Sequence, residues 1–231
     1  MVLQDKALEQ LDEANQKKAR VIFQSATCVL RDHTTSCTFD FMAVGHLRVE
    51  KDPLTLMRSV RLFGANDGVR IVHIGAALDP ELEREARRTA CECNHYRWLG
   101  ALAPSLTRRR LARARALVHM SRVEGGANAV VEAIRSNVPV LASRIDGNIG
   151  LLGHDYDGYF PVGDAAALAR IMRQFLNEPA WAKHLAAQCA SREFLFTSER
   201  EADALRALVK DMFKDRPRPK FYGGDQPSNE K

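Results

Sequence analysis

The amino-acid sequence predicts an α/β fold in which a parallel sheet carries helices on both faces and is followed by a helical C-terminal segment. Apolar, strand-like runs alternate with helix-length segments from about residue 38 to residue 142, and this alternation requires crossovers between parallel strands. Glycine and polar residues follow one strand-like run after another, at the sheet edge where open α/β sheets bind ligands.

The expected elements follow one another in a regular order. Strands are expected at 38–44, 69–75, 96–100, 116–120 and 138–142. Helices are expected at 7–20, 53–62, 80–93 and 105–114, and a further helix follows the loop after Glu124. Pro53 favours a helix start, because proline is tolerated in the first turn. After residue 150 we expect a short strand within 159–164, a helix at 165–176 with Asp164 as its N-cap, and helices at 179–192 and 198–213.

Composition and charge exclude several classes of protein. The net charge is +5, and basic residues are interleaved with acids, which fits an anionic small ligand at least as well as a nucleic acid. No apolar run approaches the roughly eighteen residues of a membrane span, and no signal peptide opens the chain, so we expect a cytoplasmic protein without stable membrane insertion. Among the five cysteines, Cys91 and Cys93 lack the further ligands of a zinc site, and no metal is expected.

Glu124 and Glu132 bracket the most informative segment. A strand-like run precedes Glu124 and a helix-like run contains Glu132, so the loop between them leads into a helix N-terminus that offers backbone N–H groups to an anion. Each acid can accept a hydrogen bond from a sugar hydroxyl. The segment therefore predicts a nucleotide-sugar site with an amide cradle formed by Gly125, Gly126, Ala127 and Asn128.

A second group of candidate residues follows the first expected strand. Gly45 lets a ligand approach the backbone, while Arg48 and Lys51 can pair with phosphates. Because this strand end lies at the same sheet edge as the Glu124 loop, the two segments predict the two halves of a diphosphate clamp. His46 and Arg48 are both candidates for the diphosphate contact.

These two segments resemble the donor-binding domain of the family 4 retaining glycosyltransferases of GT-B fold. That family has Gly-Arg-Leu and Lys-Gly after one strand, and later Glu-Gly-x6-Glu-Ala followed by Pro-Val. The resemblance implies a Rossmann-like domain in which Glu124 contacts the donor sugar, Glu132 holds the ribose hydroxyls and Lys51 binds the diphosphate. It also places Leu99 beside the nucleotide base, in the segment Trp98-Leu99-Gly100.

Departures from the family pattern resemble one subgroup, the bacterial selenosugar synthases. His46 replaces an Arg, Asp52 replaces a Gly, and Ser136-Asn137 replace a Gly before Pro139. Together with the segments 144–153 and 158–164, they imply a UDP-sugar donor and selenophosphate as the small-molecule acceptor. The reaction implied is a displacement in which diphosphate leaves from the face that the acceptor enters, with no metal or other cofactor required.

The resemblance also implies the domain organisation. Residues 1–36 are the end of a first domain and a linker, 37–177 form the donor-binding domain, 178–214 are C-terminal helices, and 215–231 are a disordered tail. GT-B enzymes place the acceptor on a first domain, which on this interpretation is missing from the chain. A non-catalytic nucleotide-sugar-binding module is therefore the alternative function.

Simpler interpretations remain open. Glu124 and Glu132 read alone are a loop acid and a surface-helix acid, Arg48 and Lys51 are solvated charges, and His46 is a polar strand-end residue. The arginines between 108 and 115 are better read as a solvated helix face than as an RNA-binding patch, because no aromatic residues interleave with them for base stacking.

Overall fold

The computed structural model describes residues 1–29, 39–64 and 67–214. These residues form one six-stranded sheet in which every pair of neighbouring strands is parallel, in the order β3-β2-β1-β4-β5-β6. The strands are β1 (Phe39–Val44), β2 (Ile71–Ile74), β3 (Tyr96–Trp98), β4 (Ala114–His119), β5 (Val140–Ser143) and β6 (Tyr159–Phe160). The strand order reverses between β1 and β4, and in doubly wound sheets this reversal creates the ligand-binding crevice.

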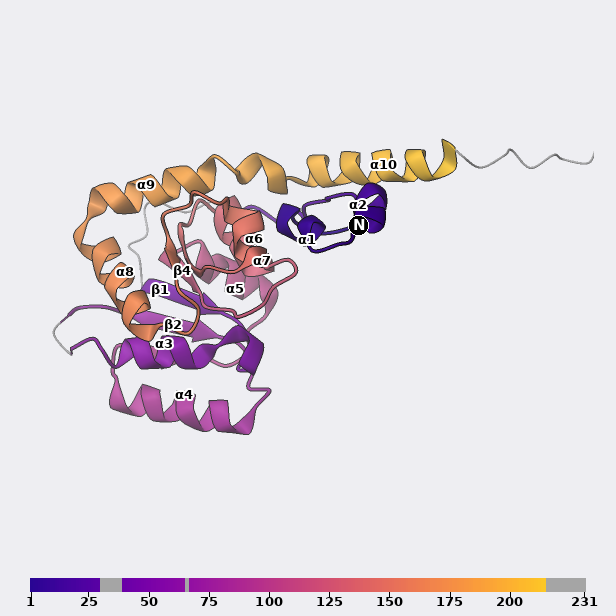
Figure 1. Ribbon diagram of the computed structural model, residues 1–231. Helices are drawn as coiled ribbons and strands as arrows, with labels where there is room; N and C mark the ends of the chain where they lie inside the picture. Colours follow the sequence, from indigo (N-terminus) through magenta and orange to yellow (C-terminus); the bar gives the residue numbers. More distant parts are fainter. Residues whose placement is uncertain (30–38, 65–66, 215–231) are drawn as a thin grey trace, which may run out of the picture.

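Helices cover both faces of the sheet, which confirms the predicted fold class (Figure 1). One face carries α3 (Pro53–Val60), α4 (Pro80–Glu92) and α8 (Ala165–Asn177). The other carries α5 (Pro104–Leu111), α6 (Asn128–Arg135) and, packed beside α6, α7 (Asp146–Leu152). As predicted, the Asp164 side chain caps α8, accepting from the N–H of Ala167 at 2.8 Å.

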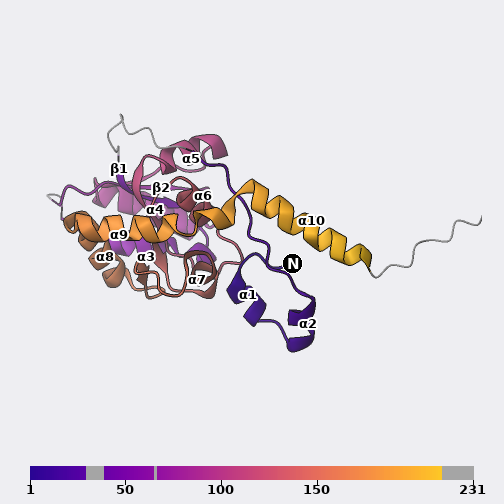
Figure 2. The same cartoon turned by 90° about the horizontal axis from the view of Figure 1, so that it is seen from above.

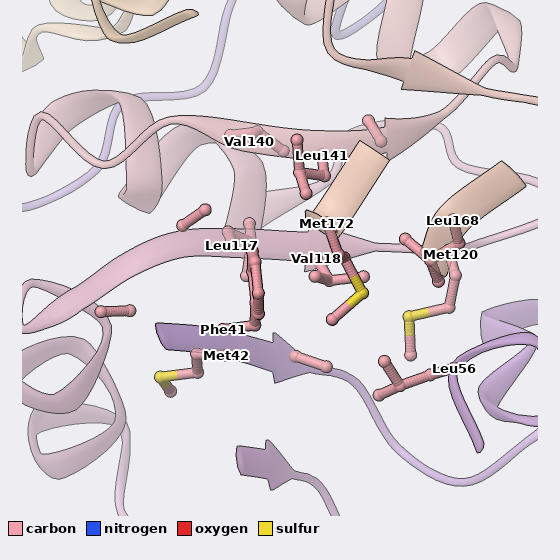
Figure 3. Packing of buried hydrophobic residues seen from close by; sticks show 14 of the residues in the cluster. Phe41, Met42, Leu56, Leu117, Val118, Met120, Val140, Leu141, Leu168 and Met172 are labelled. Carbon is pink, nitrogen blue, oxygen red and sulfur yellow. The ribbon is translucent and has the colours of Figure 1, made fainter. Parts of the chain in front are cut away.

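The core fills both faces of the central strands, against α3 and α8 on one side and α5 and α6 on the other. Phe41 and Met42 of β1 and Leu117 of β4 are fully buried, and on the α8 side Met172 lies beside Val118 and Leu168 beside Met120 (Figure 3). Continuous apolar strands are what a parallel sheet with two covered faces requires. This packing fixes the carboxyl ends of β1 and β4 beside each other.

Two local predictions differ from the structure. The expected helix 7–20 is divided into α1 (Asp5–Glu9) and α2 (Glu13–Lys18), because the chain leaves the helical conformation at Asp12 and its side chain caps α2 by accepting from the N–H of Asn15 at 2.9 Å. Helix α7 has no counterpart among the expected elements, since its sequence contains two glycines. Gly147 is required by close packing, because a Cβ there would overlap the carbonyl of Glu124.

The last described residues form helices, as predicted. Helix α9 (Pro179–Ala190) is followed by a 3-10 turn (Glu193–Phe196) and by α10 (Ser198–Lys214), which extends away from the sheet and its covering helices (Figures 1 and 2). Helix α8 ends at Asn177, but the predicted domain boundaries stay predictions. The tail predicted at 215–231 and Cys37 lie outside the described residues. No helix among the described residues is long and apolar enough to cross a bilayer, and a cytoplasmic location stays a prediction.

Candidate functional site

The carboxyl ends of β1, β2 and β4 open onto a cleft of about 550 Å³. One wall follows β1 and contains Gly45, His46, Arg48 and Lys51. The opposite wall is formed by His119, Glu124 and the start of α6 up to Glu132. The β3–α5 connection and the first turns of α5 close one end, with Ala101 and Leu102 from the former and Pro104 and Thr107 from the latter. The cleft has the size of an ordinary small-ligand site and lies at the switch point of the strand order.

Lys51 and Glu124 meet across this cleft. The Lys51 ammonium donates a hydrogen bond to Glu124 Oε1, and both side chains are largely buried. His119 Nε2 lies 3.4 Å from the same carboxylate oxygen and has no well-aligned hydrogen-bond partner among the described residues. The loops that follow β1 and β4 are therefore held together by a buried, charge-assisted contact.

Glu124 is strongly favoured in its ionised form. Burial alone would raise the pKa of its carboxyl, but donors on His119, Lys51 and Ser121 outweigh burial and lower the pKa to about 2. The carboxylate is consequently an acceptor of hydrogen bonds at any physiological pH. It is suited to a ligand hydroxyl and unsuited to donating a proton.

Glu132 has the opposite tendency. Burial raises the pKa of this carboxyl, and Arg108, with its Nη1 3.6 Å from Oε1, opposes the shift. Glu132 lies on α6, which begins at Asn128 without a side-chain cap from any described residue. The first N–H groups of α6 are thus available to an acceptor in the cleft.

His46 presents a hydrogen-bond donor to the cleft. Its Nδ1 accepts from the backbone N–H of Ala76 at 3.0 Å. Because that nitrogen acts as an acceptor, the neutral ring carries its hydrogen on Nε2. The ring therefore offers an N–H at the position where the family has an Arg.

His73 and Gly75 hold the Gly45 loop in place. His73 is fully buried, which lowers its pKa to about 4, and its Nε2 lies 3.1 Å from the Gly45 carbonyl. A carbonyl only accepts, so Nε2 carries the hydrogen, while Nδ1 accepts from the hydroxyl of Tyr96 at 3.0 Å. Gly75 has no room for a side chain, because a Cβ there would overlap the same Gly45 carbonyl.

Asp52 accounts for one departure from the family pattern. Its φ of 46° lies in the left-handed region, where glycine is the usual residue. The carboxylate accepts from Thr55 Oγ1 at 2.7 Å and pairs with Arg122 Nη2 at 3.3 Å. Asp52 thereby adds a second link between the loops that follow β1 and β4.

The N-terminal segment borders the glycine loop of the cleft. Leu3 packs so closely on Gly126 that a Cβ there would approach Leu3 Cδ1 to 2.9 Å. Helix α1 also packs against α7, and Gln10 Nε2 donates to Asp146 Oδ2 at 3.0 Å.

Most of the predicted site residues line the cleft. They are Gly45, His46, Arg48, Lys51, Glu124, Gly126, Ala127, Asn128 and Glu132. Gly125 is exposed and is not among the lining residues, and its part in the amide cradle stays a prediction. Leu99 lines a different cavity, while Ala101 and Leu102 line the cleft, and the place of Leu99 beside the base stays a prediction.

The sequence reasoning missed His119 and Thr107. His119 ends β4, so the rule that points to Gly45 after β1 and to Gly75 after β2 applies equally to it. The described residues contain no cluster of three or more side chains suited to hold a metal ion. That no metal is needed stays a prediction.

Comparisons with known proteins agree with this geometry. Residues 37–193 match the family described as glycosyl transferases group 1. Glycosyltransferase 1 domain-containing protein 1 of Xenopus tropicalis is 26% identical over 140 residues, which cover 60% of this chain and 40% of that protein.

Two solved structures share the fold. HepE of Anabaena in complex with UDP and glucose has a TM-score of 0.67 at 18% identity, over 85% of this chain and 57% of that one. The pneumococcal O-GlcNAc transferase GtfA in complex with UDP and GlcNAc has a TM-score of 0.68 at 18% identity, over 85% of this chain and 40% of that one. The chain thus spans about half the length of the proteins it resembles, and its fold is the Rossmann-like half of a GT-B enzyme. It belongs to the group 1 glycosyl transferases.

Proposed function

We propose that the cleft binds a UDP-sugar and that the chain serves the transfer of a hexosyl group from it. The observation that carries the proposal is the arrangement of Lys51, Glu124 and Glu132 around one cleft at the switch point of the sheet. HepE and GtfA, which have this fold, are described as complexes with UDP and a sugar. Lys51, Arg48 and His46 bind the diphosphate, Glu132 binds the ribose, and Ala101 and Leu102 border the base.

Donor binding requires the Lys51 ammonium to contact both Glu124 and the diphosphate. In the structure its ammonium is committed to Glu124, so a diphosphate competes with the carboxylate for the same donor. An ammonium has three N–H groups and can bridge both acceptors. Glu124 stays ionised and accepts from a hydroxyl of the donor sugar, which orients the sugar ring.

The chain's contribution to the reaction is positioning and charge neutralisation. As the bond between the sugar and the diphosphate breaks, negative charge grows on the leaving phosphate oxygen. Lys51 and Arg48 are the cations that line the cleft on the β1 side, and the α6 N-terminus adds a favourable dipole from the other. Neither Glu124 nor Glu132 acts as a nucleophile in this scheme, and no metal takes part.

Selenophosphate is the acceptor we propose, with the chain acting in selenosugar synthesis. The support is the segment 144–153, whose sequence resembles that subgroup. It forms α7 and packs under the Glu124 loop, where Gly147 touches the Glu124 backbone. The residues that distinguish the subgroup therefore adjoin the proposed sugar contact.

Two experiments separate donor binding from transfer. Calorimetric titration of UDP tests the donor site, and absence of heat from a chain with intact far-ultraviolet circular dichroism would refute the proposal. A turnover assay with UDP-GlcNAc and selenophosphate, with and without a separately supplied acceptor-binding domain, tests the reaction. Binding of UDP without turnover in either arm assigns the chain to the non-catalytic binding modules instead.

A further inference from the structure

A second cavity lies outside the donor cleft. It has a volume of about 810 Å³ and lies between β2, β3 and α5. Ile71, Val72, Leu99 and Leu106 give it an apolar floor. The chain between Leu99 and Thr107 separates it from the donor cleft, because Leu99 and Leu106 line the cavity while Ala101 and Thr107 line the cleft.

Arginine dominates the polar lining of this cavity. Five of the eleven lining residues are arginines and none is an acid: Arg70, Arg97, Arg109, Arg110 and Arg113. Arg70 has an acidic neighbour, with its Nε 3.7 Å from Asp40 Oδ2. The other four have no ion-pair partner within the described part of the chain.

Several arginines outside this cavity are paired with acids. On α4, Arg87 pairs with Glu83 at 2.6 Å and Arg88 with Glu85 at 2.8 Å. Even within the basic run, Arg108 pairs with Glu132 and Arg115 with Asp40. The basic run is therefore not one solvated helix face, since its two outer members are paired and its three middle members converge on a cavity.

Four arginines without an ion-pair partner in the described part of the chain favour an anion. Guanidinium groups bind phosphate oxygens through paired N–H donors, and each bound phosphate relieves the repulsion among the arginines. His95 also lines the cavity, and its buried Nδ1 has no hydrogen-bond partner among the described residues.

The volume and the lining of the cavity indicate which kind of ligand fits it. A cavity of this volume is in the range of small-molecule sites. No Phe, Tyr or Trp lines it, so the stacking platform of a single-stranded nucleic-acid site is lacking. We propose that this cavity is a second anion site, which binds a compact molecule carrying two or more phosphate groups independently of the donor cleft.

Titration with inorganic tripolyphosphate at constant ionic strength tests the proposal. The protein should bind it, and the variant Arg109→Gln/Arg113→Gln should bind it about tenfold more weakly or worse. The matched control Arg58→Gln/Arg170→Gln removes the same charge from α3 and α8, which do not line the cavity, and should leave the affinity unchanged. An equal loss of affinity in both double variants would mean that net charge alone explains the binding, and it would overturn the proposal.

Further arms exclude the donor cleft and nucleic acid. Lys51→Met should keep tripolyphosphate binding, and the cavity variant should bind UDP like the unmodified chain. The proposal fails if Lys51→Met loses tripolyphosphate binding, whether or not that variant still binds UDP. It also fails if a single-stranded decanucleotide binds more tightly than tripolyphosphate and depends on Arg109 and Arg113. If the double variant does not fold, Arg97→Gln on the exposed part of β3 replaces it.

Discussion

Lys51 donates a hydrogen bond to Glu124 from 73 positions away in the sequence, and so joins the loop after β1 to the loop after β4. The same loops are linked by the N–H of Arg122, which donates to the Glu50 carbonyl at 2.8 Å, and by Arg122 with Asp52. The cleft is therefore preassembled before a ligand enters. Preorganisation of this kind lowers the cost of ordering the site on binding.

The Glu124 carboxylate makes the stability of the chain depend on acid pH. Its folded pKa of about 2 lies below the ordinary value of 4.5, so the unfolded state binds more protons between those pH values. We expect the free energy of unfolding to fall as pH drops from 4.5 toward 2, by at most about 1.4 kcal/mol per pH unit from this group. Urea unfolding at pH 5, 4 and 3 should show a smaller decline for Glu124→Gln; equal declines would contradict the account.

His73 adds a second pH dependence in a different range. Its folded pKa of about 4 lies below the ordinary 6.5, so the unfolded chain takes up a proton first as pH falls. Stability from keeping His73 neutral is complete above pH 6.5 and is lost as pH falls toward 4. His73→Gln should lower the free energy of unfolding at pH 7.5. Between pH 6.5 and 4 the free energy of unfolding of this variant should depend less on pH, because unfolding then takes up one proton fewer. A parallel pH dependence in the variant would show that His73 titrates normally.

Gly75→Ala tests the close approach of β2 to the Gly45 loop. The added Cβ would overlap the Gly45 carbonyl, and we expect a loss of about 1–3 kcal/mol in the free energy of unfolding together with weaker UDP binding. Gly125→Ala is the control, because a Cβ there meets nothing within 4 Å. The two variants are compared by urea midpoints, and equal midpoints would mean that the loop has room to move.

Glu132→Gln tests the ribose contact. A charged acceptor contributes about 1.5–3 kcal/mol to a hydrogen bond, so the unmodified chain should prefer UDP over 2′,3′-dideoxy-UDP by about tenfold or more. The variant should lose most of this preference, while Glu81→Gln, an exposed acid on α4, should keep it. A preference that survives Glu132→Gln would assign the ribose hydroxyls to another residue.

The sequence was sufficient to predict the sheet, because its strands are apolar runs that parallel pairing buries on both faces. The sequence also predicted that Lys51 and Glu124 lie at the same edge of the sheet. It could not predict α7, whose glycines read as a loop until the Glu124 backbone is seen against Gly147. Nor could it separate Arg108 and Arg115 from the arginines between them, because α5 ends at Leu111 and the chain turns there into β4.

The sequence also could not predict the roles of two histidines. His119 and His73 resemble core residues in any pattern of burial. Their importance comes from side-chain contacts, with Glu124 for His119 and with the Gly45 carbonyl and the Tyr96 hydroxyl for His73.

The most direct test of the central claim compares UDP with UMP on two proteins. If Lys51 binds the diphosphate, the unmodified chain should bind UDP about tenfold or more tightly than UMP in calorimetric titrations. Lys51→Met should bind both with similar, weak affinity, and Lys183→Met, which removes an exposed lysine on α9, should behave like the unmodified chain. An undiminished preference for UDP in Lys51→Met would contradict the account.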